Sequence, residues 1–144
     1  MTLTATKENH ALTNCMSQLS FIKDLFIRYR LAESNNDYDL MDQIREEVNE
    51  APLSIEYRSG WVPHFEDDVK PEEFKLLLSW GGPACRIIGK IEDEFTLKDI
   101  EIQYQDWGTP WISLQLNSHL SDKSPQIIDD YEALDWFCNG FYFG

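Results

Sequence analysis

The sequence predicts an α+β fold with an N-terminal helical hairpin, an antiparallel sheet of four to five strands and a C-terminal helix. Apolar residues recur every three or four positions before residue 52 and again after residue 124, whereas they alternate with polar residues between 53 and 116. Helices and strands in separate stretches are typical of α+β proteins. A chain of 144 residues is expected to form a single domain, divided into 1–52, 53–116 and 124–144.

The first helix is predicted over residues 11–31, where the apolar positions follow helical spacing. Its expected buried face is Leu12, Cys15, Met16, Leu19, Ile22, Leu25, Phe26 and Tyr29. Residues 34–36 interrupt this pattern and offer an N-cap for a second helix over 37–49. The short connection predicts that the two helices pack as an antiparallel hairpin.

Alternating patterns predict strands over residues 53–58, 74–80, 85–91 and 97–104, with 111–116 as a fifth candidate. The first of these strands is expected to be half-buried, with Leu53, Ile55 and Tyr57 facing the core. Tight turns are predicted at 81–83, 92–94 and 107–110, and a longer loop at 60–71.

The last helix is expected to open at Ser124 and Pro125, because proline favours the first helical position. Apolar residues line one side of it and four acidic residues the other, and Gly140 is expected to end it. The aromatic tail, residues 141–144, is predicted to pack back against the fold.

Charge is the strongest functional signal. The chain has 26 acidic and 12 basic residues, a net charge of −14, yet 42% of it is hydrophobic. Such a folded acidic protein repels nucleic acid and anionic membranes and attracts basic protein surfaces. We therefore expect a basic partner and no direct contact with nucleic acid or membrane. Three scattered cysteines and the lack of a signal peptide or a long apolar run predict a cytoplasmic protein.

No pattern of catalytic or metal-binding residues is present. The three histidines lack zinc-ligand spacing, and His64 beside the acidic residues 66–68 is interpreted as a solvated loop. Cys85 and Cys138 fall in apolar patterns and are expected in the core. The turn at 81–83 lacks the lysine of a phosphate-binding loop. The sequence therefore predicts a non-enzymatic protein with no cofactor and no metal.

Acidic residues are grouped in the sequence, with nine acids and two bases between Glu46 and Glu73. One interpretation is a solvated surface that maintains solubility. The other is a partner-binding surface with Trp61, Phe65 and Trp136 as aromatic anchors. The acidic residues predicted for that surface are Glu46, Glu47, Glu50, Glu66, Asp67, Asp68, Glu72, Glu73, Asp129, Asp130, Glu132 and Asp135.

A second candidate site is a pocket of Arg58, Asp106, Trp107 and Trp111. Arg58 is expected to pair with Asp106, and the tryptophans to stack on the guanidinium. The alternative is a corner of the fold held by aromatic packing and one ion pair. The pocket interpretation implies a small-ligand binding module or an enzyme.

Residues 53–144 resemble small proteins of proteobacterial genomes, plasmids and prophages. The resemblance rests on the motifs RSGW at 58–61, LLLSWGGPACRI at 76–87, YQDWGTPW at 104–111 and FYFG at 141–144. No activity is attached to these proteins, so no catalytic residue carries over. The resemblance implies an accessory gene of a mobile element, and such genes often encode inhibitors of host defence.

These observations favour a small acidic inhibitor of the anti-CRISPR or antirestriction type, which binds the basic nucleic-acid channel of a bacterial defence complex. An immunity or antitoxin-type protein would use the same electrostatics against a basic toxin. The sequence leaves open the identity of the partner and whether the protein is a monomer or a dimer.

Overall fold

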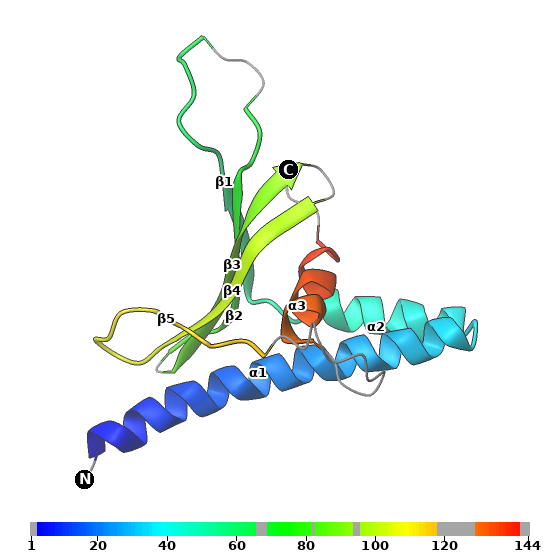
Figure 1. Ribbon diagram of the computed structural model, residues 1–144, viewed down its shortest axis with the longest axis horizontal. Helices are drawn as coiled ribbons and strands as arrows, with labels where there is room; N and C mark the ends of the chain where they lie inside the picture. Colours follow the sequence, from blue (N-terminus) through cyan, green and yellow to red (C-terminus); the bar gives the residue numbers. More distant parts are fainter. Residues whose placement is uncertain (1–2, 66–68, 82, 94–95, 118–128, 142–144) are drawn as a thin grey trace.

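The computed structural model describes residues 3–65, 69–81, 83–93, 96–117 and 129–141. Its elements are α1 (Leu3–Ser34), α2 (Tyr38–Glu50), β1 (Ser54–Arg58), β2 (Glu73–Ser79), β3 (Ala84–Asp93), β4 (Thr96–Gln105), β5 (Ile112–Ser113) and α3 (Asp130–Cys138). This order confirms the α+β class and the N-terminal helical pair (Figure 1).

The five strands form one antiparallel sheet in the order β1-β2-β3-β4-β5, so each strand pairs with its neighbour in the chain. The predicted fifth strand is too long, because β5 contains only Ile112 and Ser113. Beyond it, the Leu114 N–H still donates to the Ile102 carbonyl at 2.8 Å, and Leu114 and Leu116 pack against the core.

The helical hairpin begins earlier and ends later than the sequence suggests. Helix α1 runs from Leu3 to Ser34 instead of 11–31. The N-cap of α2 is Asp37, whose carboxylate accepts a hydrogen bond from the Leu40 N–H at 3.2 Å. The helices are therefore separated by residues 35–37, so the predicted break at 34–36 begins one residue early and does not include the capping residue.

The predicted start of the last helix, at Ser124 and Pro125, lies outside the described residues. Helix α3 begins at Asp130, and Asp129 before it has an extended backbone, with φ −69° and ψ 127°. Its carboxylate accepts hydrogen bonds from the N–H groups of Tyr131 and Glu132 at 2.8 and 3.2 Å. An acidic N-cap satisfies the first free N–H groups of α3, and this sets the helix start.

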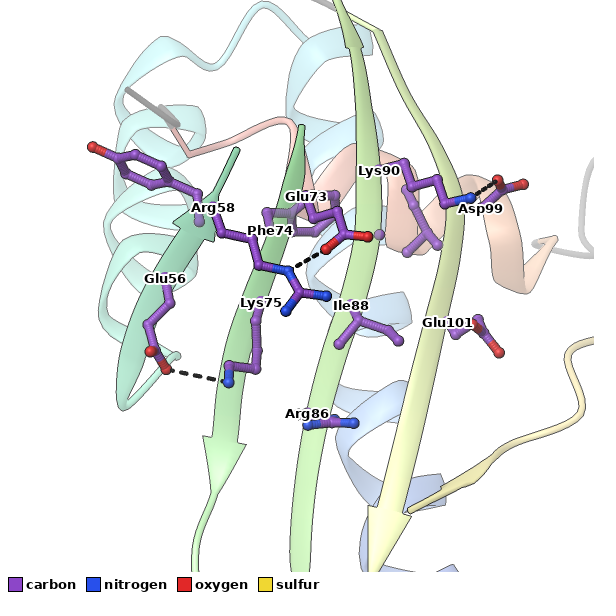
Figure 2. A pocket seen from close by; sticks show the side chains of 13 residues that line it. Glu56, Arg58, Glu73, Phe74, Lys75, Arg86, Ile88, Lys90, Asp99 and Glu101 are labelled. Carbon is purple, nitrogen blue, oxygen red and sulfur yellow. Dashed lines mark hydrogen bonds and ion pairs between the residues drawn. The ribbon is translucent and has the colours of Figure 1, made fainter. Parts of the chain in front are cut away.

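One face of the sheet is covered by helices, and no helix of the described residues packs on the other. Helix α1 packs against β3 and β4 and also against α2 and α3. The core between these layers includes Cys15, Ile22, Leu76, Ile87, Ile102, Leu134 and Phe137. Figure 2 looks onto the other face of the sheet, where side chains of β1 to β4 project in front of the strands and the helices lie behind.

The first strand was predicted to be half-buried, and this prediction is wrong for the edge strand β1. Leu53, Ile55 and Tyr57 are 43–64% exposed. Because α1 covers β3 and β4, its cover does not extend across β2 to this edge of the sheet.

Candidate functional site

Helix α2 carries four carboxylates on the face opposite its buried residues. Asp39, Asp42, Glu46 and Glu50 follow one another in steps of three, four and four residues and are all exposed. These steps keep the side chains on one side of a helix, along about 16 Å of its axis. We call these four residues the acidic stripe. Its only ion pair among the described residues joins Asp42 to Arg45 at 3.8 Å, within the helix.

Several acids predicted for the partner surface are neutralised by neighbouring bases. Glu47 lies 3.2 Å from Arg28, and Glu132 lies 3.7 Å from Arg30. Glu73 pairs with Arg58 across β1 and β2. Glu46, Glu50 and Glu72 are exposed and have no ion pair with a described residue. Glu66, Asp67 and Asp68 lie outside the described residues.

Asp130 is not available to a partner, which corrects its place in the predicted surface. Its side chain is 3% exposed, and its Oδ1 lies 2.7 Å from Nζ of Lys23 on α1. Its Oδ2 accepts a hydrogen bond from the Asn117 N–H at 2.8 Å. Asp130 therefore joins α3 to α1 and to the segment after β5. Asp129, the N-cap of α3, is also part of the structure of that helix.

The three predicted aromatic anchors differ in exposure. Trp61 and Phe65 are 104% and 76% exposed in the loop after β1. Trp136 is half-buried, and its ring centroid lies 5.3 Å from that of Phe26 and 5.4 Å from that of Tyr29. Trp136 therefore packs α3 on α1 and is not a surface anchor.

Asp135 gives a testable pH dependence. Burial raises the pKa of its carboxyl above the ordinary 3.8, more than a hydrogen bond from Asn139 lowers it. A negative charge near the C-terminal end of α3 also opposes the helix dipole. The native carboxyl then holds its proton to higher pH than the unfolded one. The ionisation of Asp135 therefore lowers the stability of the fold as the pH rises from about the ordinary pKa of 3.8 to the higher pKa of the native carboxyl.

We expect Asp135→Asn to stabilise the protein at neutral pH by about 0.3–1 kcal/mol, the usual size of a dipole effect. Urea unfolding at neutral pH and near pH 3.8 measures this, and the gain should shrink at the lower pH. A gain that is equal at both pH values would contradict the assignment.

The predicted pair of Arg58 and Asp106 does not exist. Arg58 lies on β1 and Asp106 follows β4, so two strands separate them. Arg58 binds Glu73 instead, and the Asp106 carboxylate accepts a hydrogen bond from the Trp107 N–H at 2.8 Å. Asp106 thereby holds a turn, and Trp107 is exposed. The four residues do not form one pocket.

A tryptophan does stack on an arginine, but the arginine is Arg86 of β3. Its Cζ lies 4.1 Å from the ring centroid of Trp111. The alternation of β3 indicates an outward-facing position for Arg86, since Cys85 and Ile87 face the core. Trp111 is distant from Arg86 in the sequence, so no local pattern predicts this contact.

Arg86 lines a cavity of about 810 Å³ on the uncovered sheet face. Figure 2 shows its charged side chains, which come from all four long strands. Lys75 lies 3.6 Å from Glu56, and Lys90 lies 3.7 Å from Asp99. The other residues that line the cavity are Tyr57, Arg58, Glu73, Phe74, Ile88, Gly89, Ile100 and Glu101.

Other chemistry finds little support within the described ranges. No group of three metal-ligating side chains is found there. Cys85 and Cys138 are fully buried, as predicted, and burial together with the charge of Asp135 raises the pKa of Cys138 well above its ordinary value. His64 is exposed beside Phe65, with ring centroids 5.7 Å apart. None of the described helices is long and apolar enough to cross a membrane.

No protein-family model, curated protein or solved structure matches the chain.

Proposed function

We propose that the protein is a non-enzymatic inhibitor that docks the acidic stripe of α2 on a basic, nucleic-acid-binding surface of a bacterial defence complex. The alignment of Asp39, Asp42, Glu46 and Glu50 on one exposed helix face is the observation that supports this proposal. Neighbouring carboxylates on such a face lie about 5–6 Å apart at Cβ. A row of lysines and arginines that normally holds phosphates would meet a row of anions there.

Electrostatics favour rapid association of this kind. A net charge of −14 steers the protein toward a basic surface, and screening by salt weakens that attraction. The stripe is suited to intermolecular pairing because only Asp42 is paired with a described residue. By contrast, Glu47 and Glu132 are already bound to arginines of α1. The stripe therefore retains more of its charge for a partner.

The exposed loop after β1 is the second contact that we propose. Trp61 and Phe65 lie beyond one end of β1, whereas α2 precedes the other end (Figure 1). A strand of five residues spans about 17 Å, so a large partner can contact both regions. Exposed aromatic residues of this type often dominate binding energy at protein interfaces. A basic toxin would satisfy the same requirements, which keeps an immunity-type role as the related possibility.

The first experiment uses the purified protein as bait in lysates of bacteria with active defence systems, at about 50 and about 300 mM salt. We expect capture of a CRISPR or restriction complex that is lost at the higher salt. The isolated partner should then lose nucleic-acid binding in a mobility-shift assay when the protein is added. A partner that keeps its nucleic acid in the presence of saturating protein would overturn the proposal.

Two charge variants test the stripe itself. The triple variant Asp42→Asn, Glu46→Gln and Glu50→Gln should weaken binding at least about tenfold, because it removes three of the four charges of the stripe. The matched control carries Glu72→Gln, Glu92→Gln and Glu101→Gln, three exposed acids outside α2. Both variants remove three charges, so equal losses of affinity would show that only net charge matters.

A further inference from the structure

Arg86 differs from the other arginines in its lack of a carboxylate partner. Arg28, Arg30, Arg45 and Arg58 each form an ion pair with an acidic side chain. Arg86 forms none with any residue that the structure describes, although the chain has 26 acids. Its pKa is lowered by burial, so the charged form is partly desolvated without a counter-charge. A bound anion would supply that counter-charge.

The guanidinium is held in place by contacts on two sides. Trp111 stacks on it at 4.1 Å, and the Nε–H donates to Oε1 of Gln103 at 2.8 Å. Gln103, itself buried, donates through Nε2 to the Ser113 hydroxyl at 3.2 Å. Ser113 in turn donates to Glu101. This chain of hydrogen bonds across β3, β4 and β5 fixes the side chain before any ligand arrives.

The orientation leaves the two Nη groups of Arg86 without a described partner on the cavity side. A guanidinium offers five N–H donors, and only the one on Nε is occupied by Gln103. Two parallel donors on neighbouring nitrogen atoms match the two oxygens of an oxyanion. Stacking on Trp111 also limits rotation of the plane, which lowers the entropy lost on binding.

Apart from Arg86, the charged side chains of the cavity form three ion pairs and leave one carboxylate, Glu101, without a base among the described residues. Glu56, Glu73 and Asp99 are each paired with a base from a neighbouring strand, as Figure 2 shows. Glu101 accepts the hydrogen bond from Ser113. Arg86 is therefore the cation of this cavity that no described carboxylate neutralises. Ile88, next to it on the same face of β3, offers an apolar surface for the body of a ligand.

We propose that Arg86, oriented by Trp111 and Gln103, forms a binding site on the open sheet face for a ligand with a single planar carboxylate. A carboxylate carries one negative charge and fits the guanidinium in a bidentate arrangement. Phosphate near neutrality carries more charge, and its repulsion by the nearby acids and by a net charge of −14 is correspondingly larger. The carboxylate can belong to a small organic acid or to the C-terminus of a peptide. This site lies on the face away from the helices and does not depend on the acidic stripe.

NMR titration of the intact protein with benzoate tests the proposal. We expect saturable shifts of the Arg86 Nε–H and Trp111 indole N–H signals, with a Kd of about 1 mM, typical for a small fragment. Inorganic phosphate at equal ionic strength should bind at least about fivefold more weakly. No saturable shift up to about 10 mM benzoate would overturn the proposal.

Arg86→Gln and Lys90→Gln are matched variants, since each removes one positive charge from the same cavity. Arg86→Gln should weaken benzoate binding at least about tenfold, the usual effect of losing a charge-assisted pair. Lys90→Gln should change it less than about twofold, because Asp99 already pairs with Lys90. Circular dichroism and urea unfolding establish that both variants fold. Equal losses in the two variants would mean non-specific attraction and would contradict the site.

A short peptide with a free or an amidated C-terminus distinguishes the two sources of the carboxylate. Tighter binding of the free-acid peptide than of benzoate, with loss on amidation, assigns the site to a chain terminus. Tighter binding of benzoate assigns it to small acids. Equal binding of the two peptides would contradict carboxylate recognition. The triple stripe variant should leave all these titrations unchanged, so this site and the proposed inhibitor function fail or succeed separately.

Discussion

Phe137→Ala is expected to lower the free energy of unfolding by about 3–5 kcal/mol. Phe137 is fully buried on α3 and ranks first by residue volume among the described side chains that are buried this completely. Its ring meets that of Phe141 edge-on at a centroid distance of 5.5 Å. Alanine would leave a cavity at the contact between α3 and the rest of the core, because the surrounding side chains relax only partly. A domain of this size has a total stability of about 5–15 kcal/mol.

Phe65→Ala is the matched control for this prediction. It removes the same atoms from a side chain that is 76% exposed, so its effect should stay within about 0.5 kcal/mol. Urea unfolding followed by circular dichroism measures both variants on the same scale. If Phe137→Ala lowered the free energy of unfolding no more than Phe65→Ala does, the result would contradict the packing of α3 against the core.

Most of the fold was predictable from the spacing of apolar residues, which changes between helical and strand regions of the chain. Spacing of three and four residues identifies the face of α1 that holds Cys15 and Ile22, and alternation identifies the strands. Both patterns depend only on residues that are close together in the sequence, so they can be recognised without knowing which helices and strands pack together. The start of α3 was missed because two local signals competed. Pro125 suggested one start, but the carboxylate of Asp129 satisfies the N–H groups of a later one.

The candidate sites were less predictable, because they depend on which strands and helices become neighbours. Arg58 and Asp106 looked complementary, but the meander places two strands between them. The expected stacking of tryptophan on arginine occurs at Arg86, whose outward position the alternation of β3 does indicate. No local sequence pattern predicts that Trp111 stacks on Arg86.

Some of the acidic residues predicted for the partner surface are exposed in the structure, whereas others are buried or paired. The predicted set began at Glu46 and omitted Asp39 and Asp42, although the spacing of the four acids on a helix would have joined them. Asp130 was included because its sequence neighbours are acidic. Its burial depends on Lys23, which lies more than a hundred residues earlier in the chain. Composition predicts that acids gather on a surface, but tertiary contacts decide which of them remain free.

Asp130→Ala is expected to destabilise the protein by about 2–4 kcal/mol. The substitution removes the counter-charge of Lys23, 2.7 Å away, and the acceptor of the Asn117 N–H. The side chain of Lys23 is 33% exposed, so water can partly solvate its charge and the loss stays below that of a fully buried pair. Urea unfolding measures the effect, and a double-mutant cycle with Lys23→Met isolates the pair from the lost hydrogen bond.

Glu132→Ala is the control, because Glu132 lies on the same helix and pairs with Arg30 at 3.7 Å while both side chains stay more than half exposed. Its loss should cost less than about 0.5 kcal/mol. The comparison also separates structure from binding. If Asp130 is structural, Asp130→Ala weakens partner capture only to the extent that it unfolds the protein. A variant that stayed as stable as the parent but lost the partner would return Asp130 to the binding surface and contradict its place in the core.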